Sequence, residues 1–272
     1  MAAAETDRSP LKRGSVVGFN LPAIAEIPAD RPWYWLAEGY RDMWRAPSVS
    51  LLYGALFTLV AALMVWGLTI FGMQAMILSL CGGFLLLGPM LAVGLYESSR
   101  RIEAGEQPTL ASALSAIGRA KGQLSFLGVI LMVLYLAWVQ FALILFMLFM
   151  GPVDLPPIEQ FVHSLLMTPS GLGLLGVGTA VGAVLATTAF AISAVSIPLL
   201  LVERIDAMTA VLTSIKACIM NWKPMALWAI LIAALVALGI VTLGLGLIFV
   251  FPLLGHATWH AFRDTIPEPS NR

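Results

Sequence analysis

Hydrophobic and polar positions follow one another in long blocks along this chain. Four stretches hold no Asp, Glu, Lys or Arg, over residues 46–96, 122–153, 160–202 and 224–262. A helix needs about 20 apolar residues to cross the ~30 Å hydrocarbon core of a membrane. Breaks at Phe71–Gln74 and Thr242–Gly246 divide the first and last stretches. We therefore predict about six transmembrane helices, at roughly 49–71, 75–97, 124–150, 172–200, 225–241 and 246–262. For the last stretch, one tilted or re-entrant segment fits the sequence as well as two spans.

Amphipathic segments precede these hydrophobic blocks. Helical periodicity places apolar side chains on one face over residues 33–45, 110–117 and 208–219, each ahead of a predicted hairpin. In the last segment, Met208, Ile215 and Ile219 form the apolar face and Thr209 and Thr213 lie opposite. A further short surface helix is expected just ahead of the fourth span. The first segment carries an aromatic group that fits the headgroup belt of a membrane, namely Trp33, Tyr34, Trp35, Tyr40 and Trp44.

Prolines recur at one place in the predicted hairpins. Pro89, Pro198 and Pro252 each precede an apolar pair near the inner end of an even-numbered span. A proline inside a helix removes a backbone hydrogen bond and kinks the helix. The sequence therefore predicts three repeats of an interfacial helix followed by a transmembrane hairpin. The alternative is that basic amphipathic loops and membrane prolines occur here without a repeat, as they do in many polytopic proteins.

Composition supports a membrane protein. Hydrophobic residues make up 60% of the chain and charged residues only 11%, whereas a soluble domain carries about 25% charge. This balance excludes a disordered chain, a nucleic-acid-binding protein and an ordinary cytosolic enzyme. The expected fold is an all-α polytopic membrane helical bundle. We expect a single transmembrane domain over residues 32–264, a flexible cytoplasmic N-terminal arm over residues 1–31 and a cytoplasmic tail over residues 265–272.

The basic residues are confined to one side of the predicted membrane topology. All fifteen Lys and Arg precede the first span, follow the sixth, or lie in the connections after the second and fourth spans. The predicted outer loops hold only the acidic residues Asp154 and Glu159. Because Lys and Arg are enriched in cytoplasmic loops, both termini are expected in the cytoplasm. The first 45 residues lack the apolar region of a cleavable signal, so the first span would direct membrane insertion.

His256, His260 and Asp264 form the sharpest pattern of candidate chemistry. A spacing of four places them on one helix face, where two imidazoles and a carboxylate could hold zinc or iron. The alternative is that these groups cap the inner end of the last span by bonding backbone carbonyls or lipid headgroups. The sequence shows no nucleophile elbow, paired carboxylates or phosphate-binding loop. We therefore expect no catalytic residue, no cofactor and no enzymatic activity.

The predicted spans hold no Asp, Glu, Lys or Arg, which argues against an ion-coupled transporter. Gln140 lies near a span midpoint, where a helix-to-helix hydrogen bond is favoured over a place in a solute path. The fourth span carries small residues at helical spacing, including Gly178 and Gly182, which predict close helix packing at the centre of the bundle. The third span is bulky and is expected to face lipid or a partner.

Two segments carry a resemblance to a known family. They are Gly88–Glu97 with Arg100 and Arg101, and the closing Pro252–Asp264. The chain resembles, over roughly Trp35 to Asp264, the bacterial integral membrane family catalogued as domain of unknown function 2189. The resemblance implies a bacterial inner-membrane location and brings no established activity. Some members carry a cytochrome c oxidase subunit label. Because this chain lacks the several buried histidines of a haem and copper core, that label would imply an accessory or assembly protein.

Together these patterns favour an inner-membrane protein without a catalytic site. We expect an accessory, structural or assembly component of a larger membrane complex, with a respiratory complex as one case. The expected partners are the lipid bilayer and other integral membrane proteins, and not nucleic acid. The alternative is a channel or transporter for a small solute or a lipid.

Overall fold

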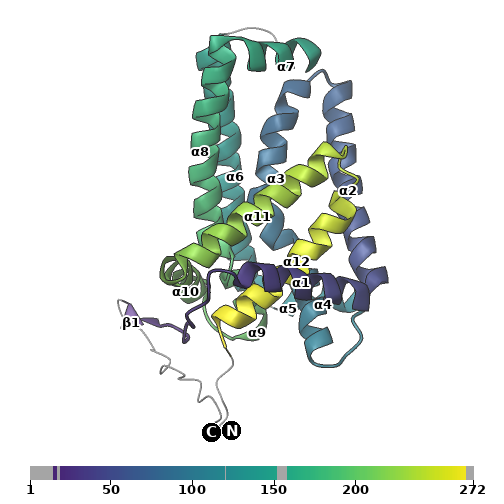
Figure 1. The fold of residues 1–272 in the computed structure, drawn as a ribbon, viewed down its shortest axis with the longest axis vertical. Coiled ribbons are helices and arrows are strands. Elements are labelled where there is room, and N and C mark those ends of the chain that lie inside the picture. Colours follow the sequence, from purple (N-terminus) through teal and green to yellow (C-terminus); the bar gives the residue numbers. More distant parts are fainter. Residues whose placement is uncertain (1–14, 17–18, 120, 152–157, 268–272) are drawn as a thin grey trace, which may run out of the picture.

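Helices dominate the structure, a computed structural model that describes residues 15–16, 19–119, 121–151 and 158–267. The long axis is followed by α2 (Pro47–Ile70), α3 (Ile77–Leu91), α6 (Lys121–Met150) and α8 (Pro169–Ser193), as Figure 1 shows. At one end, α7 (Ile158–Met167) lies across the bundle, and the short helical turn η1 (Gln74–Met76) joins α2 to α3. The predicted all-helical class is confirmed, and the surface helix ahead of the fourth span is present as α7.

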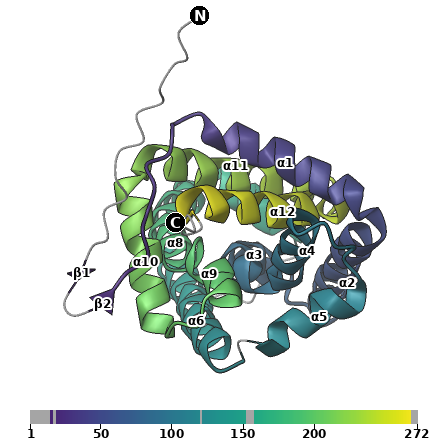
Figure 2. The same cartoon turned by 90° about the horizontal axis from the view of Figure 1, so that it is seen from below.

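Five shorter helices gather at the opposite end of the bundle (Figure 2). They are α1 (Arg31–Arg45), α4 (Val93–Glu103), α5 (Leu110–Arg119), α9 (Ser196–Val202) and α10 (Ala207–Met220). Two short strands, β1 (Ser15–Val16) and β2 (Phe19–Asn20), pair in antiparallel fashion ahead of them. Within the N-terminal arm, Leu21 and Ile24 are buried, and the Ala25 amide donates to the Thr265 carbonyl over 3.0 Å. This part of the arm is packed against the bundle.

The last two helices form an inclined hairpin. α11 (Trp222–Val241) and α12 (Leu247–Thr265) cross the bundle obliquely, and their turn lies lower in Figure 1 than the turn between α2 and α3. The predicted turn at Thr242–Gly246 is present, with positive φ at Leu243 and Gly244. The left-handed conformation favours glycine, and at Leu243 the turn imposes it on a residue with a side chain.

Four segments among the described residues are long and apolar enough to cross a membrane: Pro47–Ile70, Gly122–Met150, Pro169–Val202 and Trp222–Val241. The second and sixth predicted spans are not among them. In the second, α3 ends at Leu91 and α4 starts at Val93. In the sixth, α12 carries charged groups in its second half. The count of six spans is therefore not confirmed, and the re-entrant alternative for the last hairpin stays a prediction.

The three predicted proline sites all lie in helices, with different outcomes. Pro89 is inside α3 two residues before its end, Pro198 is near the start of α9, and Pro252 is inside α12, which continues past it. The order of a short helix followed by a helical hairpin does recur along the chain. The third hairpin is inclined while the first two follow the long axis (Figure 1). The threefold repeat stays a prediction.

Two amphipathic helices leave large apolar residues exposed. In α10, Thr209, Thr213 and Ser214 are buried while Met208 and Ile219 are exposed, so the two predicted faces are present and the face with the threonines packs against the bundle. Small side chains allow close contact here, and the Ser214 hydroxyl accepts a hydrogen bond from the Val195 amide over 3.1 Å. In α1, Trp35 is fully buried, whereas the other four aromatic residues of the predicted headgroup group are exposed, namely Trp33, Tyr34, Tyr40 and Trp44.

The main hydrophobic core lies toward the end of the bundle that holds the short helices. It joins Leu95 and Tyr96 of α4, Ile197 and Leu199 of α9, and Trp259 of α12. Apolar area removed from water stabilises such a core by roughly 25 cal/mol per Å². The upper parts of α2 and α6 are largely exposed, as expected for helices that face lipid.

Candidate functional site

The side of α12 that carried the predicted metal ligands faces into the protein. His256 is fully buried between two serines from different helices. Its Nε2 lies 2.9 Å from the Ser50 hydroxyl of α2, and its Nδ1 lies 2.7 Å from the Ser99 hydroxyl of α4. A neutral imidazole has one donor nitrogen and one acceptor nitrogen, so it can satisfy both hydroxyls. His256 therefore joins α2, α4 and α12.

One turn later, His260 contacts an acidic residue of α1. Its Nε2 lies 2.8 Å from Asp42 Oδ2, and the Asp42 carboxylate is almost completely buried and also faces Arg45 at 3.3 Å. Burial by itself would raise the pKa of Asp42, but hydrogen bonds to His260 and Ser99 and the nearby imidazoles outweigh it and hold that pKa below its usual value. The carboxylate is therefore kept ionised at the contact between α1 and α12.

Asp264 completes a row of polar contacts along α12. Its Oδ2 accepts hydrogen bonds from Arg31 Nε at 2.6 Å and from the Trp35 indole at 2.7 Å. We call His256, His260 and Asp264 the polar row of α12. Each member has partners of its own, and no group of three or more His, Cys, Asp or Glu that could hold a metal occurs among the described residues. A metal at His256 and His260 stays a prediction, while the hydrogen bonds resemble the alternative structural role.

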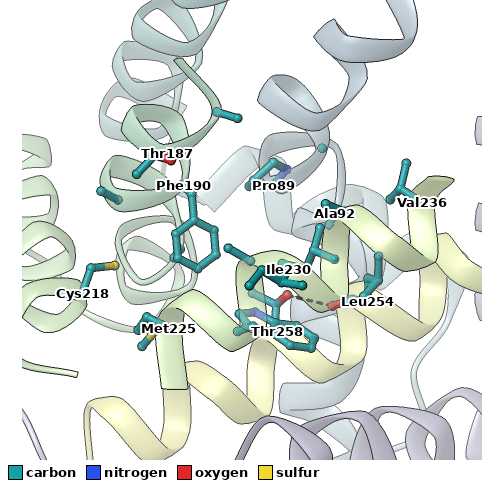
Figure 3. A pocket seen from close by; sticks show the side chains of 18 of the residues that line it. Pro89, Ala92, Thr187, Phe190, Cys218, Met225, Ile230, Val236, Leu254 and Thr258 are labelled. Carbon is teal, nitrogen blue, oxygen red and sulfur yellow. Dashed lines mark hydrogen bonds between the residues drawn. The ribbon is translucent and has the colours of Figure 1, made fainter. Parts of the chain in front are cut away.

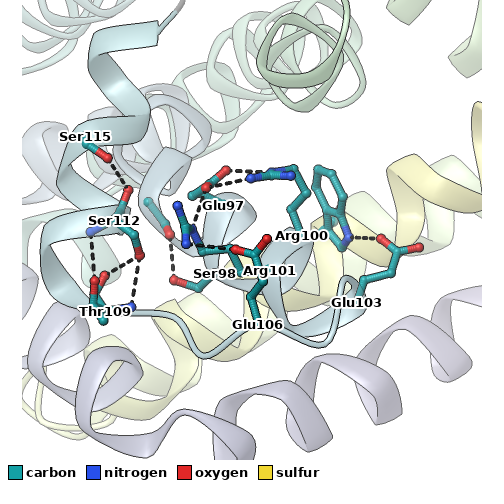
Figure 4. Close-up of polar contacts among 11 residues, drawn as sticks. Glu97, Ser98, Arg100, Arg101, Glu103, Glu106, Thr109, Ser112 and Ser115 are labelled. Carbon is teal, nitrogen blue, oxygen red and sulfur yellow. Dashed lines mark hydrogen bonds and ion pairs between the residues drawn. The ribbon is translucent and has the colours of Figure 1, made fainter.

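A second polar group lies on α4 (Figure 4). Glu97 is fully buried, and its carboxylate accepts two hydrogen bonds from Arg100, at 2.8 and 2.9 Å, and one from Arg101, at 2.8 Å. Glu103 accepts hydrogen bonds from the Trp259 indole and from Arg263 of α12, both at 3.0 Å. Glu97 therefore forms buried ion pairs within α4, and Glu103 attaches α4 to α12.

The described residues also enclose a large apolar cavity (Figure 3). Its volume is about 740 Å³, and it lies between α3, α8, α10, α11 and α12. Figure 3 shows Phe190 of α8 and Met225 of α11 pointing into it, with Pro89 behind them. The hydroxyl of Thr258, on its wall, donates to the Leu254 carbonyl over 2.7 Å. The chemistry that the wall offers to a ligand is therefore almost entirely apolar.

The cavity reaches the outer surface of the bundle. Ile219, Trp222 and Ile230 line it, and each is more than 60% exposed. These residues come from α10 and α11, at the side where the inclined hairpin leaves α8. The cavity is therefore open to the surface of the protein beside α10 and α11.

Small residues of α8 create this space. Ala183, Ala186 and Ala191 line the cavity opposite Ala229 and Ala233 of α11. The prediction from the small residues of this helix was close packing. At Gly182 it is present, because a Cβ there would lie 3.1 Å from the Trp138 ring of α6, closer than an ordinary van der Waals contact. A Cβ at Gly178 would meet no atom within 4 Å. On the cavity side, the alanines of α8 leave room for a ligand.

The sequence analysis missed the cavity because the signal was split between two distant segments. Alanines of α8 and alanines of α11 are about 40 residues apart, and each set alone is typical of membrane helices. Only the inclination of α11 places the two sets opposite each other across a gap. Facing rows of small residues on two predicted spans would have been the usable signal.

Comparison with known proteins gives one match. Residues 76–202 match the model of a family described as "Predicted integral membrane protein (DUF2189)". The matched region contains the segment Gly88–Glu97 and ends before Pro252–Asp264, so it is shorter than the resemblance inferred from the sequence. Neither the curated proteins nor the solved structures gave a match to the chain. The match confirms an integral membrane protein and assigns no activity.

Proposed function

We propose that this chain binds an acyl chain of a membrane lipid in the cavity between α8 and α11, and that it moves or presents lipids. Its match to a family of predicted integral membrane proteins means that such lipids are available to it. The observation that carries the proposal is the apolar cavity of about 740 Å³ with exposed residues at its mouth. Small-molecule sites commonly measure about 300–1,000 Å³. The cavity is therefore large enough for a lipid tail.

The expected binding would be reversible. A lipid tail leaving the bilayer for this cavity exchanges one hydrocarbon environment for another, so little hydrophobic free energy is gained. Binding then depends on packing against the wall, where each pair of carbon atoms in contact gains only about 0.1–0.2 kcal/mol. Weak binding with easy exchange suits a protein that moves or presents lipids. Of the two functions expected from the sequence, the lipid-handling alternative has this support.

A photoreactive lipid tests the proposal. The full-length protein would be reconstituted into phosphatidylethanolamine and phosphatidylglycerol vesicles that contain a phospholipid with a diazirine in its acyl chain. After illumination, peptide mass spectrometry should find labels enriched at cavity residues such as Ala186 and Ala229, relative to exposed residues of α2. Labels spread evenly over all lipid-facing helices would contradict a binding site.

A matched pair of variants separates the cavity from the surface. Ala229→Phe fills the cavity and should reduce labelling of Ala186 several-fold, whereas Ala234→Phe is on an exposed position of the same helix that does not line the cavity and should leave it unchanged. The same three proteins would be compared for transfer of fluorescent lipids between the two leaflets. Equal labelling in the two variants would refute acyl-chain binding at this site.

The accessory role in a larger membrane complex, respiratory or otherwise, also stays a proposal, as do the inner-membrane location and the cytoplasmic termini. The bulky face of α6 supports it, since an exposed apolar face can also be a protein contact. Gentle extraction followed by native electrophoresis and mass spectrometry would find the chain in a large assembly with other proteins. Migration as this chain alone, as a monomer or a small oligomer, would exclude that role.

A further inference from the structure

Helix α6 has two opposite faces with different environments. Its inner face contains Leu124, Leu131 and Leu145, which are buried, and Trp138, whose indole donates to the Ser79 carbonyl over 2.7 Å. These four residues are seven apart, so they follow one line along the helix. They fix the side of α6 that packs within the bundle against α3 and α8.

The outer face carries a regular seam. Its residues are spaced alternately by three and four positions, as in the contact positions of a coiled coil. They are Phe126, Val129, Val133, Leu136, Gln140, Leu143 and Met147. Five of the apolar members are at least 50% exposed, and Leu143 is half-buried. We call these seven residues the outer seam of α6. It lies directly opposite the line of Leu131 and Trp138, and no helix among the described residues covers it.

Gln140 is the member of the outer seam that requires a partner. It is exposed, lies near the middle of the candidate span Gly122–Met150, and has no hydrogen bond to another described residue. A carboxamide without a partner in hydrocarbon costs several kcal/mol. Thr69 and Thr188, which are also exposed on membrane helices, donate to carbonyls of their own helices. No such hydrogen bond to its own helix is present for Gln140 among the described residues.

We propose that the outer seam of α6 binds the same seam of a second copy of this chain, with the two Gln140 side chains hydrogen-bonded to each other. All copies of a membrane protein insert in the same orientation, so a twofold axis perpendicular to the membrane brings two α6 helices together in parallel. Gln140 then meets the partner's Gln140 at the same depth. A carboxamide contains a donor and an acceptor, so two of them are complementary without any other group.

The pattern favours a second copy over an unrelated protein. A seam spaced by three and four matches the crossing of about 20° that is common for membrane helices. The seam carries no charge that would select an oppositely charged partner. The exposed faces of α2 and α11 hold large apolar residues such as Leu63 and Ile230 without a carboxamide, and they suit lipid contact. The cavity has no lining residue on α6, so this proposal is independent of lipid binding.

Cysteine cross-linking in membranes tests the register. In a full-length chain with Cys81→Ala and Cys218→Ala, Leu136→Cys lies in the seam and should form a disulfide-linked dimer with mild oxidant. Phe141→Cys is also exposed, five residues further along α6, but lies outside the seam, so it should give at least several-fold less dimer. Equal cross-linking at the two positions, or none at position 136, would overturn the proposal. Cross-links from position 136 to a different protein would also overturn it.

The role of the carboxamide is tested by measuring dimerisation in lipid. A Gln140→Leu variant keeps the apolar seam and the helix but loses the hydrogen bonds. Interhelical hydrogen bonds of this kind are worth about 0.6–2 kcal/mol, which corresponds to a dimer dissociation constant about 3- to 30-fold higher. Phe141→Leu is the matched control and should leave the constant unchanged. An unchanged constant for Gln140→Leu, or a monomeric wild-type protein in lipid, would refute the proposal. Acyl-chain labelling of the cavity should be the same in all three proteins.

Discussion

Replacing His256 by leucine tests whether the polar row of α12 holds the helices together. The change removes the hydrogen bonds to Ser50 and Ser99 while an apolar side chain of moderate size fills the site. Each bond contributes about 0.5–1.5 kcal/mol, and a buried hydroxyl left without its partner costs about 1–3 kcal/mol. The cost is smaller at Ser50, because its hydroxyl also contacts the Ala46 carbonyl at 2.9 Å. We expect His256→Leu to lower the free energy of unfolding by about 2–4 kcal/mol.

The measurement is reversible unfolding of the full-length protein in mixed micelles, followed by tryptophan fluorescence. His163→Leu is the matched control, because His163 is exposed on α7 and its replacement should change stability by no more than about 0.5 kcal/mol. A double-mutant cycle with Ser99→Ala should show a coupling of about 0.5–3 kcal/mol between the two sites. If His256→Leu is as stable as His163→Leu, or if its effect simply adds to that of Ser99→Ala, the reasoning about this contact is wrong.

Three further predictions concern groups at the same end of the bundle. The pKa of Asp42 is lowered in the folded protein, so the contribution of its carboxylate to stability should be complete above the usual carboxyl pKa of about 3.9. This contribution should be lost as the pH falls from there through the lower folded pKa. Asp42→Asn should remove this part of the acid dependence of unfolding. Asp206 accepts hydrogen bonds from the amide and the hydroxyl of Thr209, at 2.9 and 2.6 Å, so Asp206→Ala should cost about 0.5–2 kcal/mol of stability and Asp206→Asn less. If the metal prediction holds, elemental analysis should find a stoichiometric metal that disappears in a variant with His256→Ala and His260→Ala, and equal metal in both proteins would remove it.

The sequence predicted structure best where a single local requirement decides it, such as the need for backbone hydrogen bonds within a membrane. Long uncharged blocks must be helices in a membrane because every backbone group needs an internal partner. The segments Pro47–Ile70, Gly122–Met150, Pro169–Val202 and Trp222–Val241 match four of the predicted spans within a few residues. Turns at Gly72 and Gly244 were also predictable, since both glycines have positive φ. Helix existence and turn position therefore followed from local sequence.

The parts that failed depend on tertiary contacts. Periodicity separated the two faces of α10, but it could not show that the face with Thr213 would be the one packed against the bundle, because that depends on its neighbours in space. The spacing of His256 and His260 predicted one shared helix face, which is correct. It could not show that Ser99 and Asp42, from α4 and α1, would occupy that face as hydrogen-bond partners. The inclination of α11, which opens the cavity, has no local sequence signal.

The position of α12 in the chain has a consequence for biosynthesis. Chains fold from the N-terminus as they are made, and α12 is the last of the described helices to leave the ribosome. Nevertheless, Asp42 of α1, Ser50 of α2 and Ser99 of α4 all find a partner on it. Until α12 inserts, these polar groups lack their contacts to His256 and His260. We therefore expect the first half of the protein to stay incompletely packed until α12 is made. A chain interrupted before α12 would expose these polar groups, and quality-control proteases could recognise it.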